Sequence, residues 1–286
     1  MTLFQISVGI VLLFSWAVRP ILYRPVIKIF PSKMSPAFTS VWLVVTLIAT
    51  FPLLGHLLYN NLQLTLFSPF AFISIYKGAT LFYLIELQQI VNKESTSSSV
   101  FLSFIALALG ALVNNIFFNE GLGAIKVLCI LGFGVLGIIF FIKGDANRIS
   151  RKAKLSFVIV TIIMASYTIS DHLAIPKIGW YPHLFISSVV MFVFSLAHGI
   201  SKQDFKNMFL YKPIICAGIF YAISEFLVIY ASINILPVSI VALFLRLSVP
   251  VVMIYSAICY HEQSLKNQLL FGICAILLAV PIILIK

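Results

Sequence analysis

The chain has 286 residues, of which 62% are hydrophobic and only 9% are charged. A soluble globular domain is about half apolar and about a quarter charged, so this composition is typical of a protein whose solvent is lipid. It excludes a soluble enzyme, a disordered chain and a secreted disulfide scaffold. The net charge is +11, but in a membrane protein basic residues sort into the connections on one side, so we do not expect nucleic acid as a partner.

Long apolar runs divide the chain into predicted membrane-spanning helices, because a hydrocarbon core of about 30 Å needs roughly 20 apolar residues per helix. The runs are continuous and do not alternate with a period of two, as the strands of a β-barrel would. The first run lacks a basic start and a small-residue cleavage site, so we expect a helix there rather than a cleaved signal peptide. The ten predicted spans are 3–18, 36–58, 68–90, 98–118, 122–142, 155–175, 183–199, 213–232, 239–259 and 267–285.

Basic residues concentrate in alternate connections between these spans. The first connection holds Arg19, Arg24, Lys28 and Lys33, whereas Lys177 is the basic residue of the even-numbered connections. Short basic connections tend to face the cytoplasm. This pattern therefore predicts that the odd-numbered connections are cytoplasmic and that both termini lie outside.

The two halves of the chain are related by an internal repeat. Val100–Glu120 aligns with Ala242–Glu262, and Ser15–Val18 aligns with Ser166–Ile169. Each half then holds five spans, and an odd number forces the second half to enter the membrane in the opposite sense. The predicted fold class is all-α and integral to the membrane, with ten transmembrane helices forming two inverted five-helix repeats. The predicted parts are a first repeat at 1–143, a basic linker at 144–154 and a second repeat at 155–286.

Two short motifs carry a resemblance to a known family. They are Ser15-Trp16-Ala17 with its echo Ser166-Tyr167, and Val249-Pro250 followed by Glu262 and Gly272. With these motifs the whole chain resembles the drug/metabolite transporter superfamily, in particular the ten-helix group built from two EamA-type domains. The resemblance implies transport of amino acids, nucleotide-linked sugars, choline, S-adenosylmethionine or other small polar metabolites. It also implies cytoplasmic termini, opposite to the connection charges, so the orientation stays open.

Charged residues inside predicted spans are candidates for function, since a charge at the bilayer centre costs about 2.5–3.5 kcal/mol. Arg246 lies within the ninth span, and its permanently charged, bidentate guanidinium suits a substrate carboxylate or phosphate. Glu225 and Glu86 are its expected partners. They are also candidates for proton coupling, because a carboxyl group can change protonation as a cavity opens or closes. The alternative for each of these residues is a permanent structural ion pair.

Aromatic and basic side chains complete the predicted site. Lys77 either contacts substrate or extends to the membrane surface. Trp16 and Tyr167 are related by the repeat, and rings at both positions would suit stacking on substrate or contact with a cation. Asp171 and His172 are expected to form a solvated pair at the membrane interface, where Trp42 and Trp180 would belong to an aromatic belt. The predicted substrate-binding residues are Arg246, Glu225, Glu86, Trp16, Tyr167, Tyr83 and Lys77.

Two glutamates recur in the repeat and are predicted to be structural. Glu120 and Glu262 each close one span and precede the next. A carboxylate at a helix N-terminus accepts hydrogen bonds from free backbone N–H groups and is stabilised by the helix dipole. We therefore expect each glutamate to cap the helix that follows it.

The motifs that the sequence lacks limit the chemistry. It has no phosphate-binding glycine loop, nucleophile elbow or His/Cys ligand cluster, so we expect no ATP, cofactor, metal or enzymatic activity. Cys129, Cys216, Cys259 and Cys274 lie in apolar runs and are expected to be small core residues.

Together these patterns predict a secondary active transporter or exchanger in a lipid bilayer, the bacterial cytoplasmic (inner) membrane. It would move a small polar metabolite by alternating access, with protons as a candidate coupling ion. The alternative is an integral-membrane enzyme or scaffold subunit that handles lipid-like substrates.

Overall fold

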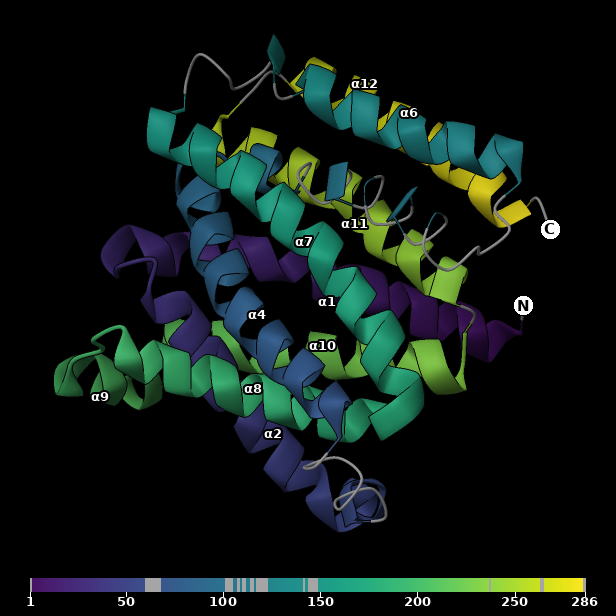
Figure 1. Cartoon of the computed structure of the whole chain (residues 1–286). Helices are drawn as coiled ribbons and strands as arrows, with labels where there is room; N and C mark the ends of the chain where they lie inside the picture. Colours follow the sequence, from purple (N-terminus) through teal and green to yellow (C-terminus); the bar gives the residue numbers. More distant parts are fainter. Residues whose placement is uncertain are drawn as a thin grey trace.

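The structure is a computed structural model of the whole chain (Figure 1). It describes every residue except 1, 60–67, 101–104, 107–108, 110–111, 114–115, 117–122, 141, 144–148, 237, 263–264 and 285–286. Within the helices, the side chains of 56–59, 165, 167–168, 232, 238–240, 242–243, 246, 265, 279–280 and 282–284 also lie outside the description.

The elements formed by the described residues are helices. They are α1 (Leu3–Ile29), α2 (Met34–Tyr59), α4 (Pro69–Glu94), α6 (Ala124–Phe140), α7 (Arg151–Ile178), α8 (Trp180–Ala197), α9 (Lys202–Leu210), α10 (Lys212–Asn234), α11 (Val238–Tyr260) and α12 (Leu265–Leu284). Each of them except α9 coincides with a predicted apolar span, and the predicted span 98–118 falls largely on residues outside the description.

Six of the described helices are long and apolar enough to cross a membrane, namely α1, α2, α4, α7, α8 and α10. Shorter apolar helical stretches are Ala124–Phe140, Leu247–Tyr260 and Lys266–Leu278. Large apolar side chains such as Phe72, Leu128 and Leu277 are exposed on the outer surface, as expected where lipid replaces water as the solvent. These helices indicate a multi-pass membrane protein.

Helix α1 continues well beyond its predicted end. Its first turn has a capping box, in which the Thr2 side chain accepts from the Gln5 backbone N–H and the Gln5 side chain accepts from the Thr2 N–H. The helix then continues to Ile29 and includes two prolines, Pro20 and Pro25. The prediction that the first span ends at residue 18 is therefore wrong. Arg19 and Arg24 belong to the helix, and neither lies in a connection.

The proline at position 25 changes the hydrogen bonding of α1. Proline has no backbone N–H, so the carbonyl four residues earlier loses its helical donor. That carbonyl belongs to Ile21, and it accepts a hydrogen bond from the hydroxyl of Tyr260 in α11 at 3.3 Å. One bond within α1 is thus replaced by a bond between two helices.

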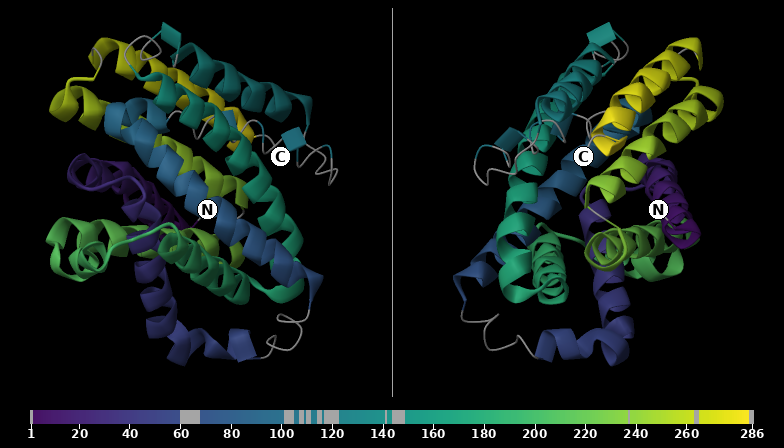
Figure 2. Two further views of the ribbon diagram at one scale, coloured as in Figure 1. Left: turned by 60° about the vertical axis from the view of Figure 1, so that its left-hand side comes forward. Right: turned by 90° about the vertical axis from the view of Figure 1, so that its right-hand side faces the viewer.

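The helices pack in two connected groups (Figures 1 and 2). Helices α4, α7 and α8 pack on one another, α2 joins them through α8, and α10 packs on α2 and α1. The second group holds α6, α11 and α12, and it joins the first mainly through the contact of α11 with α1 and also through a smaller contact of α11 with α10. The start of α1 and the end of α12 lie at the same end of the molecule in both figures.

Glycines permit the closest approaches within the first group. A Cβ atom on Gly78 of α4 would lie 2.5 Å from the carbonyl oxygen of Ser187 in α8. A Cβ atom on Gly218 of α10 would lie 2.2 Å from Cδ1 of Trp42 in α2. A side chain at either position would push the helices apart.

Two expectations about apolar residues are wrong. Cys216 and Cys259 are exposed, and Cys129 and Cys274 are only partly buried, so the four cysteines are not core residues. Trp180 is buried against Tyr181 and Phe226 instead of lying in an exposed aromatic belt. The long, uniformly apolar helices give no sequence signal for which face meets lipid, and this explains both errors.

Candidate functional site

A largely buried ion pair joins α1 to α10. Arg19 Nη1 donates to Glu225 Oε1 at 2.9 Å, and the two side chains are only 12% and 13% exposed. The sequence predicted Glu225 as a site residue but gave it Arg246 as a partner. The partner in the structure is Arg19, which the sequence analysis had placed in a connection.

Aromatic rings enclose the Arg19 guanidinium. Its central carbon lies 3.9 Å from the ring centroid of Trp16 and 3.7 Å from that of Tyr221. Both distances are within the range for a cation–π interaction, which strengthens when water is excluded. Trp16, a predicted site residue, therefore lies beside Arg19, and Tyr221 is an addition. The predicted contact of Trp16 with substrate stays a prediction. The guanidinium has a carboxylate at one edge and a ring on each of two sides.

Three predicted residues cannot be placed by their side chains. The backbones of Arg246 and Tyr167 lie in α11 and α7, but both side chains are outside the described residues. Glu120 falls in the undescribed segment 117–122. Their predicted roles stay predictions.

A second buried cluster joins α4, α7 and α8. Lys77 Nζ lies 2.5 Å from Asp171 Oδ1, and the same oxygen lies 2.8 Å from Nε2 of His183. The Lys77 and His183 side chains are 2% and 1% exposed, whereas that of Asp171 is 26% exposed. Lys77 thus does not extend to the membrane surface, and the expectation that Asp171 and His172 form a solvated pair is wrong. Asp171 instead bridges two buried basic groups.

The imidazole of His183 has a partner on each ring nitrogen. Nε2 faces Asp171, and Nδ1 lies 2.7 Å from the hydroxyl oxygen of Ser74, which is itself fully buried. The Ser74 hydroxyl is also 3.3 Å from the carbonyl oxygen of Phe70, one turn earlier in α4. Serine, histidine, aspartate and lysine therefore form one connected array.

A third cluster surrounds Glu262. Its carboxylate accepts from the backbone N–H groups of Thr96 and Ser97 at 2.7 and 2.9 Å, and it pairs with Arg24 of α1. The chain is helical from Thr96 to residue 100. Glu262 therefore caps a helix start in the first half of the chain. Residues 263–264, which connect it to α12, lie outside the described residues, so its predicted cap on α12 stays a prediction. Arg24 also donates to the Thr96 hydroxyl at 2.7 Å.

The two remaining predicted residues lie on α4. Tyr83 is 42% exposed, and its hydroxyl is 3.4 Å from Nε2 of His198. Glu86 is partly buried, and the described part of the chain brings no cation to it. The structure therefore does not join either residue to the Arg19–Glu225 pair.

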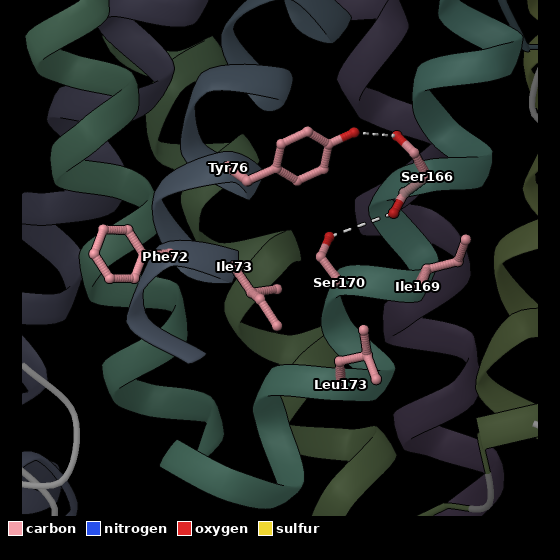
Figure 3. Close-up of a pocket in the computed structure, with 7 residues that line it drawn as sticks. All are labelled: Phe72, Ile73, Tyr76, Ser166, Ile169, Ser170 and Leu173. Carbon is pink, nitrogen blue, oxygen red and sulfur yellow. Dashed lines mark hydrogen bonds between the residues drawn. The ribbon is translucent and has the colours of Figure 1, made fainter. Parts of the chain in front are cut away.

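An open pocket lies between α4 and α7 on the outer surface, where the lining side chains Phe72 and Tyr76 are 73% and 49% exposed (Figure 3). Its volume is about 390 Å³, near the lower end of the range for small-molecule sites. The Tyr76 hydroxyl reaches across it and donates to the Ser166 hydroxyl at 3.1 Å. The lining residues are Phe72, Ile73, Tyr76, Ser166, Ile169, Ser170 and Leu173. Tyr76 and Ser170 precede Lys77 and Asp171, so the pocket and the second cluster share the same two helix segments.

The sequence contained some signal for the residues that were missed. Apolar residues resume on both sides of Arg24, as Pro20-Ile21-Leu22-Tyr23 and Pro25-Val26-Ile27, and this pattern favours a continuing helix. Tyr221 precedes Glu225 by one helical turn. Nothing in the sequence pairs His183 with Ser74, because 109 residues separate them.

Comparison with models of known protein families gave no match, and comparison with curated proteins gave none either. Among the described residues, no group of three or more His, Cys, Asp and Glu side chains could hold a metal ion. Function must therefore be argued from the site itself.

Proposed function

We propose that the chain is a secondary transporter of a small polar metabolite, built as two inverted five-helix repeats like the EamA-type drug/metabolite transporters that it resembles. The observation that carries the proposal is the Arg19–Glu225 pair, buried between two helices long and apolar enough to cross a membrane. Charged groups at such positions are costly and commonly mark the path of a polar substrate. The membrane that we propose is the bacterial cytoplasmic membrane.

The pattern of helix contacts supports the repeat. If the halves are exchanged, α1 replaces α7, α2 replaces α8, α4 replaces α10 and α6 replaces α12. The contact of α1 with α10 then becomes that of α7 with α4, and the contact of α2 with α10 becomes that of α8 with α4. All four contacts are extensive, and α2 with α8 and α6 with α12, which exchange into themselves, are in contact too. These contacts are related as a pseudo-twofold axis would relate them, whereas, among the described residues, the smaller contacts of α4 with α1 and α2 have no equal counterpart between α10 and α7 or α8.

Chemically, the Arg19–Glu225 ion pair can exchange its carboxylate for an acidic group of a substrate. The Arg19 guanidinium binds the Glu225 carboxylate. An acidic group of a substrate would compete with this carboxylate for Arg19, because a guanidinium binds carboxylate or phosphate with two N–H donors. The ring centroids of Trp16 and Tyr221 lie 3.9 and 3.7 Å from the central carbon of the guanidinium. Arg246 stays a candidate second cation for the same substrate.

Transport by purified protein in lipid vesicles tests the proposal. Radiolabelled amino acids, nucleotides, choline and S-adenosylmethionine would each be offered singly, and uptake would be compared with that of protein-free vesicles. We expect at least one compound to accumulate and Arg19→Gln to abolish its uptake. Arg151→Gln, at an exposed arginine at the start of α7, is the matched control and should transport normally.

Two results would overturn the proposal in different ways. If no compound enters faster than into protein-free vesicles, the transporter function fails. If a compound enters and Arg19→Gln, folded as judged by its elution in detergent, transports it at the normal rate, the site assignment fails.

A further inference from the structure

The array of Ser74, His183, Asp171 and Lys77 has a feature that a static structural network does not need. Each partner of the imidazole can serve two protonation states of the ring. We propose that His183 is a reversible proton-binding site, held by Ser74 and Asp171 in both states. Building on the proposed function, we infer that this proton is the coupling ion of transport.

The neutral state satisfies every polar atom around the ring. A proton on Nε2 donates to Asp171 Oδ1 across 2.8 Å, and Nδ1 accepts from the Ser74 hydroxyl across 2.7 Å. Lys77 and Asp171 carry opposite charges, so the cluster is neutral overall. This is the favoured state at rest, because a second buried cation beside Lys77 would lack compensation.

The protonated state is also satisfied, and it requires only the rotation of one hydroxyl. The added proton binds to the Nδ1 lone pair, and Nδ1–H then donates to Ser74 Oγ. The Ser74 O–H turns toward the Phe70 carbonyl oxygen, 3.3 Å away. Nε2–H keeps its bond to Asp171. No covalent bond breaks, no donor loses its acceptor, and the charge of the cluster rises by one.

The position of Asp171 connects this proton to movement of the helices. Asp171 belongs to α7, whereas His183 belongs to α8 and Lys77 to α4. A shift of α7 away from α8 would take the counter-ion from a protonated His183, and the proton would leave. Proton binding would conversely hold α7 against α8. This reciprocity is what coupling of a proton to alternating access requires.

The surroundings contain few other groups that could take over this role. The charged groups that act on His183 are Asp171 of α7 and Lys77 of α4. Helix α2 packs on α8, but its residues from Met34 to Gly55 include no ionisable side chain. On α8 itself, the Tyr181 hydroxyl donates to the Leu47 carbonyl oxygen at 2.5 Å.

The same array does not suit hydrolysis. Ser74, His183 and Asp171, hydrogen-bonded in that order, resemble a nucleophilic triad. The Ser74 side chain, however, is completely buried. A nucleophile must meet its substrate, whereas binding of a proton needs no room for a second molecule. The geometry therefore favours proton binding.

Nuclear magnetic resonance of protein with isotope-labelled histidine, in detergent or nanodiscs, tests the proton site directly. The His183 ring signals would be assigned by their loss in His183→Gln. We expect them to change reversibly between about pH 4 and about pH 9, with both nitrogens protonated at the acid end. Asp171→Asn should weaken proton binding by about tenfold or more, because the counter-ion is lost. His172→Gln, at the exposed neighbouring histidine, should leave the titration unchanged.

His183 signals that stay constant over this range in folded protein would overturn the proton site. So would a titration that Asp171→Asn leaves unaltered. Neither result depends on finding a substrate.

Vesicles with an imposed pH gradient test the coupling, with the labelled compound that gave uptake above. We expect the gradient to drive accumulation of that compound in the unaltered protein. In His183→Gln the gradient should lose this effect while exchange of labelled for unlabelled compound continues. Uptake that ignores the gradient in the unaltered protein would overturn the coupling and leave the transporter function intact. An unchanged response in His183→Gln would overturn the role of His183.

Discussion

The Arg19 guanidinium has surroundings that an ammonium group cannot use equally well. Its plane lies against Trp16 and Tyr221, and its edge meets Glu225. Lysine would keep the charge but lose the planar fork and the stacking area.

We therefore expect Arg19→Lys to raise the KM for a transported compound about tenfold, which corresponds to roughly one cation–π contact. Initial uptake rates over a range of concentrations would measure it. Arg151→Lys should leave KM unchanged, and equal effects of the two substitutions would show that Arg19 does not contact the substrate.

We expect the Arg24–Glu262 ion pair to stabilise the folded protein. Glu262 is held by two backbone N–H groups and Arg24, and removal of one partner leaves a buried charge uncompensated. Arg24→Gln should lower the free energy of unfolding by about 3–5 kcal/mol. Thermal unfolding in detergent would measure this, with Arg151→Gln as the control. Similar melting temperatures for the two variants would contradict the expectation.

Among the elements, the contact of α4 with α8 depends on one glycine. The carbonyl oxygen of Ser187 occupies the place of a Gly78 side chain, and backbone atoms of a packed helix cannot move aside cheaply.

We expect Gly78→Ala to destabilise the protein by about 1–3 kcal/mol, which a thermal melt would detect. Gly123→Ala is the control, because nothing lies within 4 Å of its added methyl group. If the two variants melt alike, the two helices are not closely packed at this point.

The elements also show which predictions a sequence supports. Apolar runs located the described helices well, because the length of a run alone determines whether it can cross a membrane. They failed at the end of α1, where arginines were interpreted as the start of a connection. Arg19 and Arg24 can remain within a helix only because Glu225 and Glu262 neutralise them, and those partners are more than half the chain away. Local patterns contain no information about such distant pairs.

The candidate site was predicted in part for the same reason. Trp16 and Glu225 stood out as residues, one beside small side chains and one as a lone charge in an apolar run. Their connection through Arg19 is a property of the packed helices. The array around His183 was missed because a histidine and a serine in apolar runs are individually unremarkable.

For the molecule as a whole, the positions of the helix ends limit the topology. The start of α1 and the end of α12 lie at the same end (Figures 1 and 2), as an even number of crossings requires. Reporters fused to the two termini should therefore respond alike, both from the cytoplasm or both from outside. A response from outside would agree with the charges of the connections, and a response from the cytoplasm would agree with the family resemblance. Opposite responses would refute an even number of crossings and with it the paired repeats.

The hydrogen bond from Tyr260 to Ile21 has a mechanical consequence. Pro20 and Pro25 each remove one backbone hydrogen bond from α1, so this stretch is where the helix bends most easily, and the Tyr260 hydroxyl supplies a replacement at the Ile21 carbonyl. The first turns of α1 are held on α11 as well, since Leu12 packs with Val241 and Leu245. Tyr260 therefore ties α11 to α1 at a point between Arg19 and Arg24, so a bend at this point would change the orientation of the Arg19–Glu225 pair relative to the Arg24–Glu262 pair.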